Sequence, residues 1–330
     1  MSGLATDRPR FRLFDGPSPL APLTRLSAEL GGRAEIWIKR EDLLPLAFGG
    51  NKLRNLEFLV GAALAEGADS LVTFGRRWSN HCRLTAAAGA VAGLDVHLVL
   101  SGPPTDPPNP GARLDALLGA TVHQATSGAR AERDDLVERV VRDLQSAGRR
   151  PYLIPVGGGG STGAAGQVLA AGELLAQAAA AGIAIDQIVL PSATGVTQAG
   201  LLAGLRAGGS LATVVGVAVA HPPDELGPTI AHLLAELVEL SGVLVAAAQI
   251  ELDGAELGSG YGRPTSAADE ATRLLARTEG ILVDPIYTAK ALAGLVRRVR
   301  EGRADGQRIV FWHAGGLPGL FEPPDDPPPG

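Results

Sequence analysis

Short runs of β-branched and other apolar residues alternate along this chain with longer stretches whose apolar residues recur at helical spacing. The strand-like runs lie at residues 35–39, 70–74, 95–100, 152–156, 187–190, 212–219 and 308–313. The helical spacing is clearest at Leu53, Leu56, Val60 and Leu64. This alternation predicts an α/β fold in which parallel strands are joined by crossover helices. Folds of this kind bind ligands at the carboxyl ends of strands, in the loops that lead into helices.

The length and charge of the chain narrow its class. A chain of 330 residues is long enough for about two domains. A net charge of −6 argues against a nucleic-acid partner, and the single cysteine, Cys82, excludes a disulfide framework and a zinc ribbon. The N-terminus lacks an apolar signal core, and no uncharged stretch of about 18 apolar residues suggests a membrane span. We therefore expect a cytoplasmic protein without a metal site.

Lysine is rare in this chain. Of its 29 Lys and Arg residues, only Lys39, Lys52 and Lys290 are lysine. A genomic base bias toward arginine codons explains the scarcity, so each remaining lysine is either chance or a position that arginine cannot fill. A desolvated lysine amine can lose its proton and attack a carbonyl, which a guanidinium cannot do.

The segment around Lys52 reads "AFGGNK" and comes directly before a predicted helix. Gly49 and Gly50 permit a close approach of the backbone, and Asn51 is a good N-cap residue. Lys52 then lies in the first helical turn, where the helix dipole favours the neutral amine. Taken alone, the segment is more typical of a capped helix that carries a surface lysine.

Polar residues follow the strand predicted at residues 70–74. Ser79, Asn80 and His81 present a hydroxyl, an amide and an imidazole at a helix N-terminus, which suits a carboxylate or an anionic ring oxygen. The alternative is that Ser79 only caps the helix. Cys82 is predicted to pack in the core, because no catalytic pattern surrounds it.

The segment "LPSATGVTQAGLLAGL" (190–205) joins a strand end to an apolar helix through small and hydroxyl residues. Backbone N–H groups there, with the hydroxyls of Thr194 and Thr197, would hold a phosphate at the helix dipole. The segment is neither a Walker motif nor a dinucleotide fingerprint. The four glycines at 157–160 are predicted to form a flexible turn rather than a phosphate site.

Two tyrosines, Tyr261 in "GSGYGRPT" and Tyr287 in "DPIYTAK", could project into a cleft or simply pack. A reactive lysine, a phosphate loop and polar clusters at strand ends together indicate pyridoxal 5′-phosphate, whose aldehyde forms a Schiff base with lysine.

Several motifs resemble one enzyme family in sequence and in order. They are "IKREDLLPLAFGGNKLRNLEF", "SNHCRLTAAAGAVAGL", "TGVTQAGLLAGL", "EGILVDPIYTAKALAGL" and "FWHAGGLPGLF". Together they are similar to the D-cysteine desulfhydrase and 1-aminocyclopropane-1-carboxylate (ACC) deaminase family, over roughly residues 10–321. The resemblance implies fold type II of the pyridoxal-phosphate enzymes, which is tryptophan synthase β-like.

The implied architecture is two three-layer αβα domains with mostly parallel sheets and the cofactor between them. We expect residues 1–50 and 161–321 to form the larger, cofactor-binding domain and residues 51–160 the smaller one. The Pro-rich tail, 322–330, is predicted to be disordered because its prolines suit neither helix nor strand. A homodimer is the default for such enzymes.

The resemblance also implies roles for individual residues. Lys52 would carry the cofactor, with Asn51 beside it, and Asn80 would hydrogen-bond the cofactor's ring oxygen. Ser79 would contact the substrate carboxylate or exchange a proton, and Tyr261 and Tyr287 would be the two catalytic tyrosines. The phosphate would be held by the amides and hydroxyls of Ala193, Thr194, Gly195, Val196 and Thr197.

Two positions depart from the family near the pyridine nitrogen. Thr288 stands where ACC deaminases have glutamate, and Ala314 stands where desulfhydrases have threonine. Thr288 remains the candidate partner of that nitrogen, but a neutral hydroxyl would not hold the ring protonated. Elimination of a good leaving group tolerates an unprotonated pyridine ring better than chemistry that needs the ring as a full electron sink. His81 resembles the desulfhydrase form, whereas the "SATGVT" loop resembles the deaminase form.

The segment "GRRWSNH" departs most from the family. Arg76 and Arg77 suggest that a small amino-acid substrate carries a second anionic group, such as a sulfonate, phosphonate or carboxylate. The alternative is that one or both point to solvent or pair with an acidic side chain. Trp78 would narrow the substrate pocket, and His81 would lie beside the substrate.

The sequence therefore predicts a pyridoxal-phosphate lyase or deaminase that eliminates a β-substituent from a small amino acid, giving a 2-oxo acid and ammonia. Three alternatives remain open. They are ACC-type ring opening, a biosynthetic β-replacement that takes an anionic substrate, and a homologue that only binds ligand.

Overall fold

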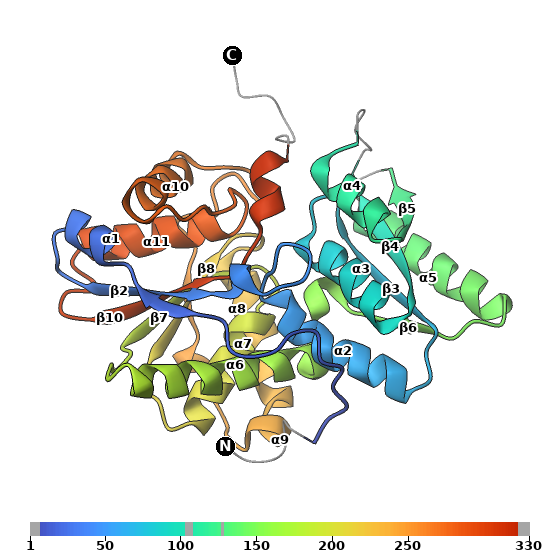
Figure 1. The fold of residues 1–330 in the computed structure, drawn as a ribbon, viewed down its shortest axis with the longest axis horizontal. Coiled ribbons are helices and arrows are strands. Elements are labelled where there is room, and N and C mark those ends of the chain that lie inside the picture. Colours follow the sequence, from blue (N-terminus) through green and yellow to red (C-terminus); the bar gives the residue numbers. More distant parts are fainter. Residues whose placement is uncertain (1–6, 103–107, 127–128, 323–330) are drawn as a thin grey trace.

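The computed structural model describes residues 7–102, 108–126 and 129–322. Its strands form two sheets, one of six strands and one of four (Figure 1). Of the predicted Pro-rich tail, only Glu322 lies within the described residues.

The larger sheet has the strand order β1-β2-β10-β7-β8-β9. Only β1 runs antiparallel to its neighbour, and the other pairs are parallel. Its strands are β1 (Leu20–Pro22), β2 (Glu35–Arg40), β7 (Gln187–Ser192), β8 (Thr213–Ala218), β9 (Glu251–Asp253) and β10 (Arg308–His313). The smaller sheet has the order β5-β4-β3-β6 and is parallel throughout. Its strands are β3 (Ser70–Arg76), β4 (Asp95–Ser101), β5 (Thr121–Ala125) and β6 (Pro151–Leu153).

Helices cover both faces of each sheet (Figure 1). On the larger sheet, one face packs against α6 (Gly160–Ala180), α7 (Val196–Ala207), α8 (Pro223–Glu236) and α9 (Val238–Ser241). The other face packs against α1 (Thr24–Glu29), α10 (Ser266–Glu279) and α11 (Thr288–Arg300). On the smaller sheet, α2 (Lys52–Ala65) and α3 (Asn80–Ala92) cover one face and α5 (Arg130–Ser146) the other. Helix α4 (Pro110–Leu117) packs beside α3.

The predicted α/β class with mostly parallel sheets is confirmed. All seven predicted strands are present, although the run at 152–156 is only a strand over Pro151–Leu153. The strands β1, β5 and β9 were not predicted, because they have only three to five residues and too few positions to set a period. The domain bounds 1–50 with 161–321 and 51–160 stay a prediction. None of the helices in the described ranges is long and apolar enough to cross a membrane.

A buried ionic cluster holds α2 against the larger sheet. The guanidinium of Arg54 on α2 donates to Glu41, which follows β2, and to Glu173 on α6. The Nε–Oε2 distance to Glu41 is 2.5 Å, and both side chains are buried. Lys39 on β2 donates to Glu173 and, over 2.6 Å, to the carbonyl oxygen of Ser18. The cluster fixes the start of α2 relative to β2 and α6.

Candidate active site

Lys52 is the first residue of α2 and lies near the carboxyl ends of β2 and β10. The loop before it is held by backbone hydrogen bonds, from Gly50 N to Glu41 O (2.9 Å) and from Asn51 N to Ala314 O (3.0 Å). Gly50 has a φ of +128°, and a Cβ there would lie 3.2 Å from the carbonyl oxygen of Ala314, so glycine suits this close approach. Burial lowers the pKa of Lys52 from 10.5 to about 8.

Asn51 occupies the N-cap position of α2, but its side chain does not cap the helix. Its Nδ2 instead donates to Oγ1 of Thr197 over 2.8 Å, and its carbonyl oxygen accepts from Nε2 of Gln167 over 2.9 Å. The expectation of a side-chain cap is therefore wrong: Asn51 has helical backbone angles (φ −56°, ψ −20°), whereas a capping residue is normally extended. The bond joins the lysine loop to the loop after β7.

The loop after β7 contains the five residues predicted to hold a phosphate. Gly195 has a φ of +77°, and α7 begins at Val196. The first backbone N–H groups of α7 have no acceptor within the helix, and they face this turn. Thr197 is buried, whereas Ala193 and Thr194 are partly exposed.

The glycine run at 157–160 lies against this loop, which the sequence did not indicate. A Cβ on Gly157 would come 3.1 Å from Thr194, and one on Gly158 would come 3.5 Å from Cε1 of His81. The carbonyl oxygen of Gly158 accepts from Nδ2 of Asn55 over 2.9 Å. The turn is thus fixed by contacts instead of being flexible, and its glycines permit two other segments to approach.

The residues after β3 differ in their hydrogen bonds and burial. Oγ of Ser79 accepts from Cys82 N over 3.2 Å, so Ser79 caps α3 and keeps its hydroxyl proton for another acceptor. Oδ1 of Asn80 accepts from Arg83 over 2.9 Å. Cys82 packs in the core as predicted, and burial raises the pKa of its thiol to about 12.

His81 is buried beside Lys52. Its Nε2 hydrogen-bonds Oγ1 of Thr73 over 2.9 Å, and within the described residues its Nδ1 has no partner. Burial, followed by the positive charge of Lys52, lowers the pKa of His81 to about 3. The ring is therefore neutral and adds no competing charge next to the lysine.

The hydroxyls of Tyr261 and Tyr287 hydrogen-bond each other, and their ring centroids lie 5.9 Å apart. Burial raises the pKa of Tyr261, and burial with the neighbouring Tyr261 raises that of Tyr287 well above 10. Trp78 lies on the other side of Tyr261, at 6.1 Å between centroids. Both phenols therefore stay protonated at neutral pH.

Asp284 fixes the backbone around Tyr287 and was not singled out by the sequence. Its carboxylate accepts from the backbone N–H groups of Ile286, Tyr287 and Thr288 at 2.9–3.0 Å. The Thr288 hydroxyl donates to the same carboxylate over 2.6 Å, and Thr288 is fully buried. That proton is therefore used within the turn, which counts against the predicted role of Thr288 beside a pyridine nitrogen. The sequence feature that could have indicated Asp284 is its position just before a helix.

The two arginines of "GRRWSNH" have different surroundings. Arg77 is buried, and its guanidinium carbon lies 4.8 Å from the centre of the Trp78 ring. Its Nη1 lies 3.8 Å from where a Cβ on Gly102 would be, so it packs toward the end of β4. Arg76 is only partly buried, and its charge acts on Tyr261. Of the two arginines, only Arg76 remains a candidate for contacting the substrate.

The other two lysines have structural partners. Lys39 belongs to the buried ionic cluster, and Nζ of Lys290 donates to the carbonyl oxygen of Leu257 over 2.8 Å. Both side chains are fully buried. Lys52 is therefore the lysine available for chemistry.

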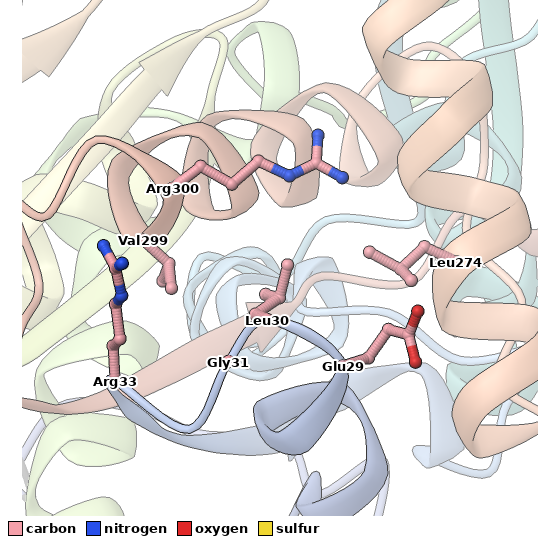
Figure 2. Close-up of a pocket in the computed structure, with 7 residues that line it drawn as sticks. All are labelled: Glu29, Leu30, Gly31, Arg33, Leu274, Val299 and Arg300. Atoms are coloured by element: carbon pink, nitrogen blue, oxygen red, sulfur yellow. The ribbon is translucent and has the colours of Figure 1, made fainter.

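A pocket of about 310 Å³ lies elsewhere, between α1, α10 and α11 (Figure 2). Glu29, Arg33 and Arg300 line it with apolar neighbours. Arg33 comes just before β2 begins, whereas Lys52 lies beyond the end of β2. The pocket is thus at the opposite end of the sheet from the candidate site.

The residues around Lys52 fit pyridoxal phosphate. The segment 193–197 offers backbone amides and hydroxyls to a phosphate. Gly157 has no side chain to crowd Thr194 in this segment. Nδ1 of His81 is a buried polar atom without a partner in the described chain, as expected where a bound group completes the site. Lys52 has the lowered pKa that Schiff-base formation needs.

Comparisons with known proteins agree with this fit. The family model described as "Pyridoxal-phosphate dependent enzyme" matches residues 11–315. The chain is 40% identical to a 1-aminocyclopropane-1-carboxylate deaminase of Burkholderia vietnamiensis, over 94% of this chain and 95% of that one. It is 41% identical to a D-cysteine desulfhydrase of Yersinia enterocolitica, over 95% of each chain.

A crystal structure of an ACC deaminase homologue superposes with a TM-score of 0.90 at 36% identity, covering 97% of this chain and 95% of that one. A pyridoxal 5′-phosphate-dependent aspartate racemase shares the fold, with a TM-score of 0.66 at 16% identity over 91% and 90% of the two chains. The resemblance predicted from the motifs is confirmed, and so is the dependence on pyridoxal phosphate. This chain belongs to the pyridoxal-phosphate dependent enzymes, among relatives named D-cysteine desulfhydrase and ACC deaminase.

Proposed function

We propose that this enzyme eliminates a β-substituent from a small amino acid and releases a 2-oxo acid and ammonia, as its relatives named D-cysteine desulfhydrase suggest. The observation that carries the proposal is the pair of protonated tyrosines, Tyr261 and Tyr287, in the same site as a lysine of lowered pKa. Elimination needs both a base for the α-proton and an acid for the leaving group.

Lys52 is the proposed base. With a pKa of about 8, a useful fraction of its amine is neutral near pH 7, and the neutral amine can accept the Cα proton. The bound cofactor supplies the electron withdrawal that makes this proton acidic. Because His81 is neutral, it does not oppose the charge that Lys52 acquires.

The N-terminus of α3 is the proposed site for the substrate carboxylate. The Ser79 hydroxyl still has its proton to donate, and the helix dipole favours an anion there. Asn80 is proposed to donate its Nδ2 to the cofactor's ring oxygen, since its Oδ1 is occupied by Arg83. These contacts would orient the amino acid with its Cα toward Lys52.

The tyrosine pair is proposed to donate a proton to the leaving group. A nucleophilic tyrosine, as ring opening would use, needs the phenolate, and the raised pKa values of both tyrosines oppose its formation. The protonated pair therefore favours elimination over ACC-type ring opening.

The test is an assay of the purified holoenzyme with D- and L-cysteine, D- and L-cysteate, β-chloroalanine and ACC. The wild-type holoenzyme should release 2-oxo acid and ammonia from at least one β-substituted amino acid. The Lys52→Ala variant should lose this activity. Turnover of ACC alone would favour ring opening. A holoenzyme that turns over none of them would overturn the proposal.

We also propose that the enzyme is a cytoplasmic homodimer. In support of the dimer, Leu43 and Phe48, in the segment before Lys52, expose 54% and 55% of their surface and could pack against a second copy. Light scattering coupled to gel filtration would give the mass in solution, and a monomer would contradict the dimer.

A further inference from the structure

We propose that Arg76 binds a negatively charged β-substituent, so that the substrates are amino acids whose β-carbon carries a sulfonate or a phosphate ester. This inference rests on the proposed elimination and adds the class of substrate to it.

Arg76 lies at the carboxyl end of β3, close to the N-terminus of α3. It is the last residue of β3, and its carbonyl oxygen accepts from Ser79 N over 2.9 Å. This turn leads directly into α3, whose N-terminus is the proposed carboxylate site. A side chain at this strand end lies where ligands bind in parallel α/β folds.

Arg76 is partly buried, yet the described residues give its side chain no ion pair and no hydrogen bond. Removing a guanidinium from water is costly unless a carboxylate or another anion compensates it. Other partly buried arginines among the described residues are paired, such as Arg40 with Asp42 and Arg297 with Asp253. An anionic ligand would supply the missing partner.

The charge of Arg76 acts on Tyr261, one of the two paired tyrosines. Trp78, two residues further along, lies 6.1 Å from Tyr261, and a Cβ on Gly262 would come 2.8 Å from the Trp78 ring. Segments 76–79 and 261–262 are therefore packed together. Burial raises the pKa of Tyr261, and the positive charge of Arg76 is among the effects that oppose this rise. The guanidinium is thus near the groups that would meet the leaving substituent.

The neighbouring Arg77 provides the contrast within the same turn. It is 8% exposed, lies over the Trp78 ring, and packs toward Gly102. The two consecutive side chains therefore have different surroundings, because Arg77 packs on Trp78 whereas Arg76 is partly exposed. Only Arg76 is left to meet a ligand.

The reaction balances without an oxidant. The Cα–H bond breaks and its proton passes to Nζ of Lys52, while the Cβ–X bond breaks and its electron pair leaves on X, as sulfite or phosphate. A Cα=Cβ double bond forms, and water hydrolyses the resulting 2-aminoacrylate to the 2-oxo acid and ammonia. Arg76 would hold X before the bond breaks and stabilise the charge that gathers on it afterwards.

The experiment compares Arg76→Gln with the wild-type holoenzyme on D- and L-cysteate and on neutral β-chloroalanine. Loss of a charge-assisted contact should lower kcat/KM for the active cysteate enantiomer by about 10- to 100-fold. The value for β-chloroalanine should stay within about threefold. Arg113→Gln, which removes a charge from an exposed position on α4, should leave both substrates unaffected.

A binding measurement separates recognition from catalysis. Calorimetry with 3-sulfopropanoate, which lacks an amine and cannot react, should show binding to wild type and a loss of about 10-fold or more in Arg76→Gln, whereas butanoate should bind both alike.

Equal losses on cysteate and β-chloroalanine would overturn the inference and assign Arg76 to the α-carboxylate. Turnover of β-chloroalanine but of neither cysteate nor O-phosphoserine by wild type would also overturn it while leaving the elimination intact. Failure of wild type on every amino acid would instead reject the proposed function.

Discussion

Nδ2 of Asn51 donates to Oγ1 of Thr197 over 2.8 Å, and both side chains are buried. The bond joins the residue before Lys52 to the loop that is proposed to hold the phosphate. The two ends of the cofactor, its aldehyde and its phosphate, are bound by these two segments in the proposed arrangement. This hydrogen bond therefore contributes directly to the spacing between the groups that must hold one small molecule.

Thr197→Val should weaken both the fold and cofactor binding. The valine leaves the Nδ2 of Asn51 buried without an acceptor, which costs about 1–3 kcal/mol of unfolding free energy. Urea unfolding of the apoprotein and a titration with pyridoxal phosphate would measure the two losses. Thr229→Val, at an exposed site on α8, is the matched control and should stay within about 0.5 kcal/mol. An unchanged cofactor affinity would show that the Asn51–Thr197 bond does not set the spacing.

Lys52→Met should stabilise the apoprotein at neutral pH. Burial lowers the pKa of Lys52 to about 8 in the folded chain, whereas the unfolded chain keeps about 10.5. Between these values the unfolded state binds more protons, so the stability contributed by this group rises with pH across that window. The variant lacks the group, and its melting temperature should exceed that of wild type below pH 8. The gap should close toward pH 10.5, and a gap independent of pH would contradict the lowered pKa.

Tyr287→Phe should lower kcat/KM by about 10²- to 10⁴-fold, because the leaving group loses its proton donor. Tyr261→Phe should have a similar effect, and the double variant should lose much less than the product of the two, since the hydroxyls act as one pair. Tyr152→Phe, on β6, is the control and should retain activity. Multiplicative losses in the double variant would show that the hydroxyls act separately.

Arg54→Met should destabilise the protein by about 3–5 kcal/mol, because it leaves the buried carboxylate of Glu41 without its cation. The double variant Arg54→Met, Glu41→Gln should recover part of this loss. Arg300→Met, which breaks an exposed pair with Glu270, should cost about 0–1 kcal/mol. Equal effects at the two arginines, measured by urea unfolding, would mean that burial does not make the cluster important.

Sequence patterns predicted the parts of this protein that repeat a period or carry unusual chemistry. The strand runs predicted the mostly parallel sheets, and the scarcity of lysine directed attention to Lys52. Local patterns did not predict which long-range partner a side chain would choose. Asn51 looked like a helix cap, but it bonds Thr197, which lies 146 residues away. Arg76 and Arg77 are adjacent and chemically identical, and only the fold shows that one packs over Trp78.

The site also depends on residues whose role comes from their surroundings. Asp284 resembles an ordinary residue before a helix until its four hydrogen bonds around Tyr287 and Thr288 are seen. The glycines at 157 and 158 looked like a flexible turn because nothing in the sequence places Thr194 and His81 beside them.

The identity of the reactive lysine is the central claim, and a chain with three lysines allows a clean test. The purified holoenzyme would be reduced with borohydride, digested, and its modified peptide identified by mass spectrometry. The account predicts a pyridoxyl group on Lys52 and on no other residue. A pyridoxyl group on Lys39 or Lys290, or a holoenzyme whose cofactor is not trapped on any lysine, would contradict it.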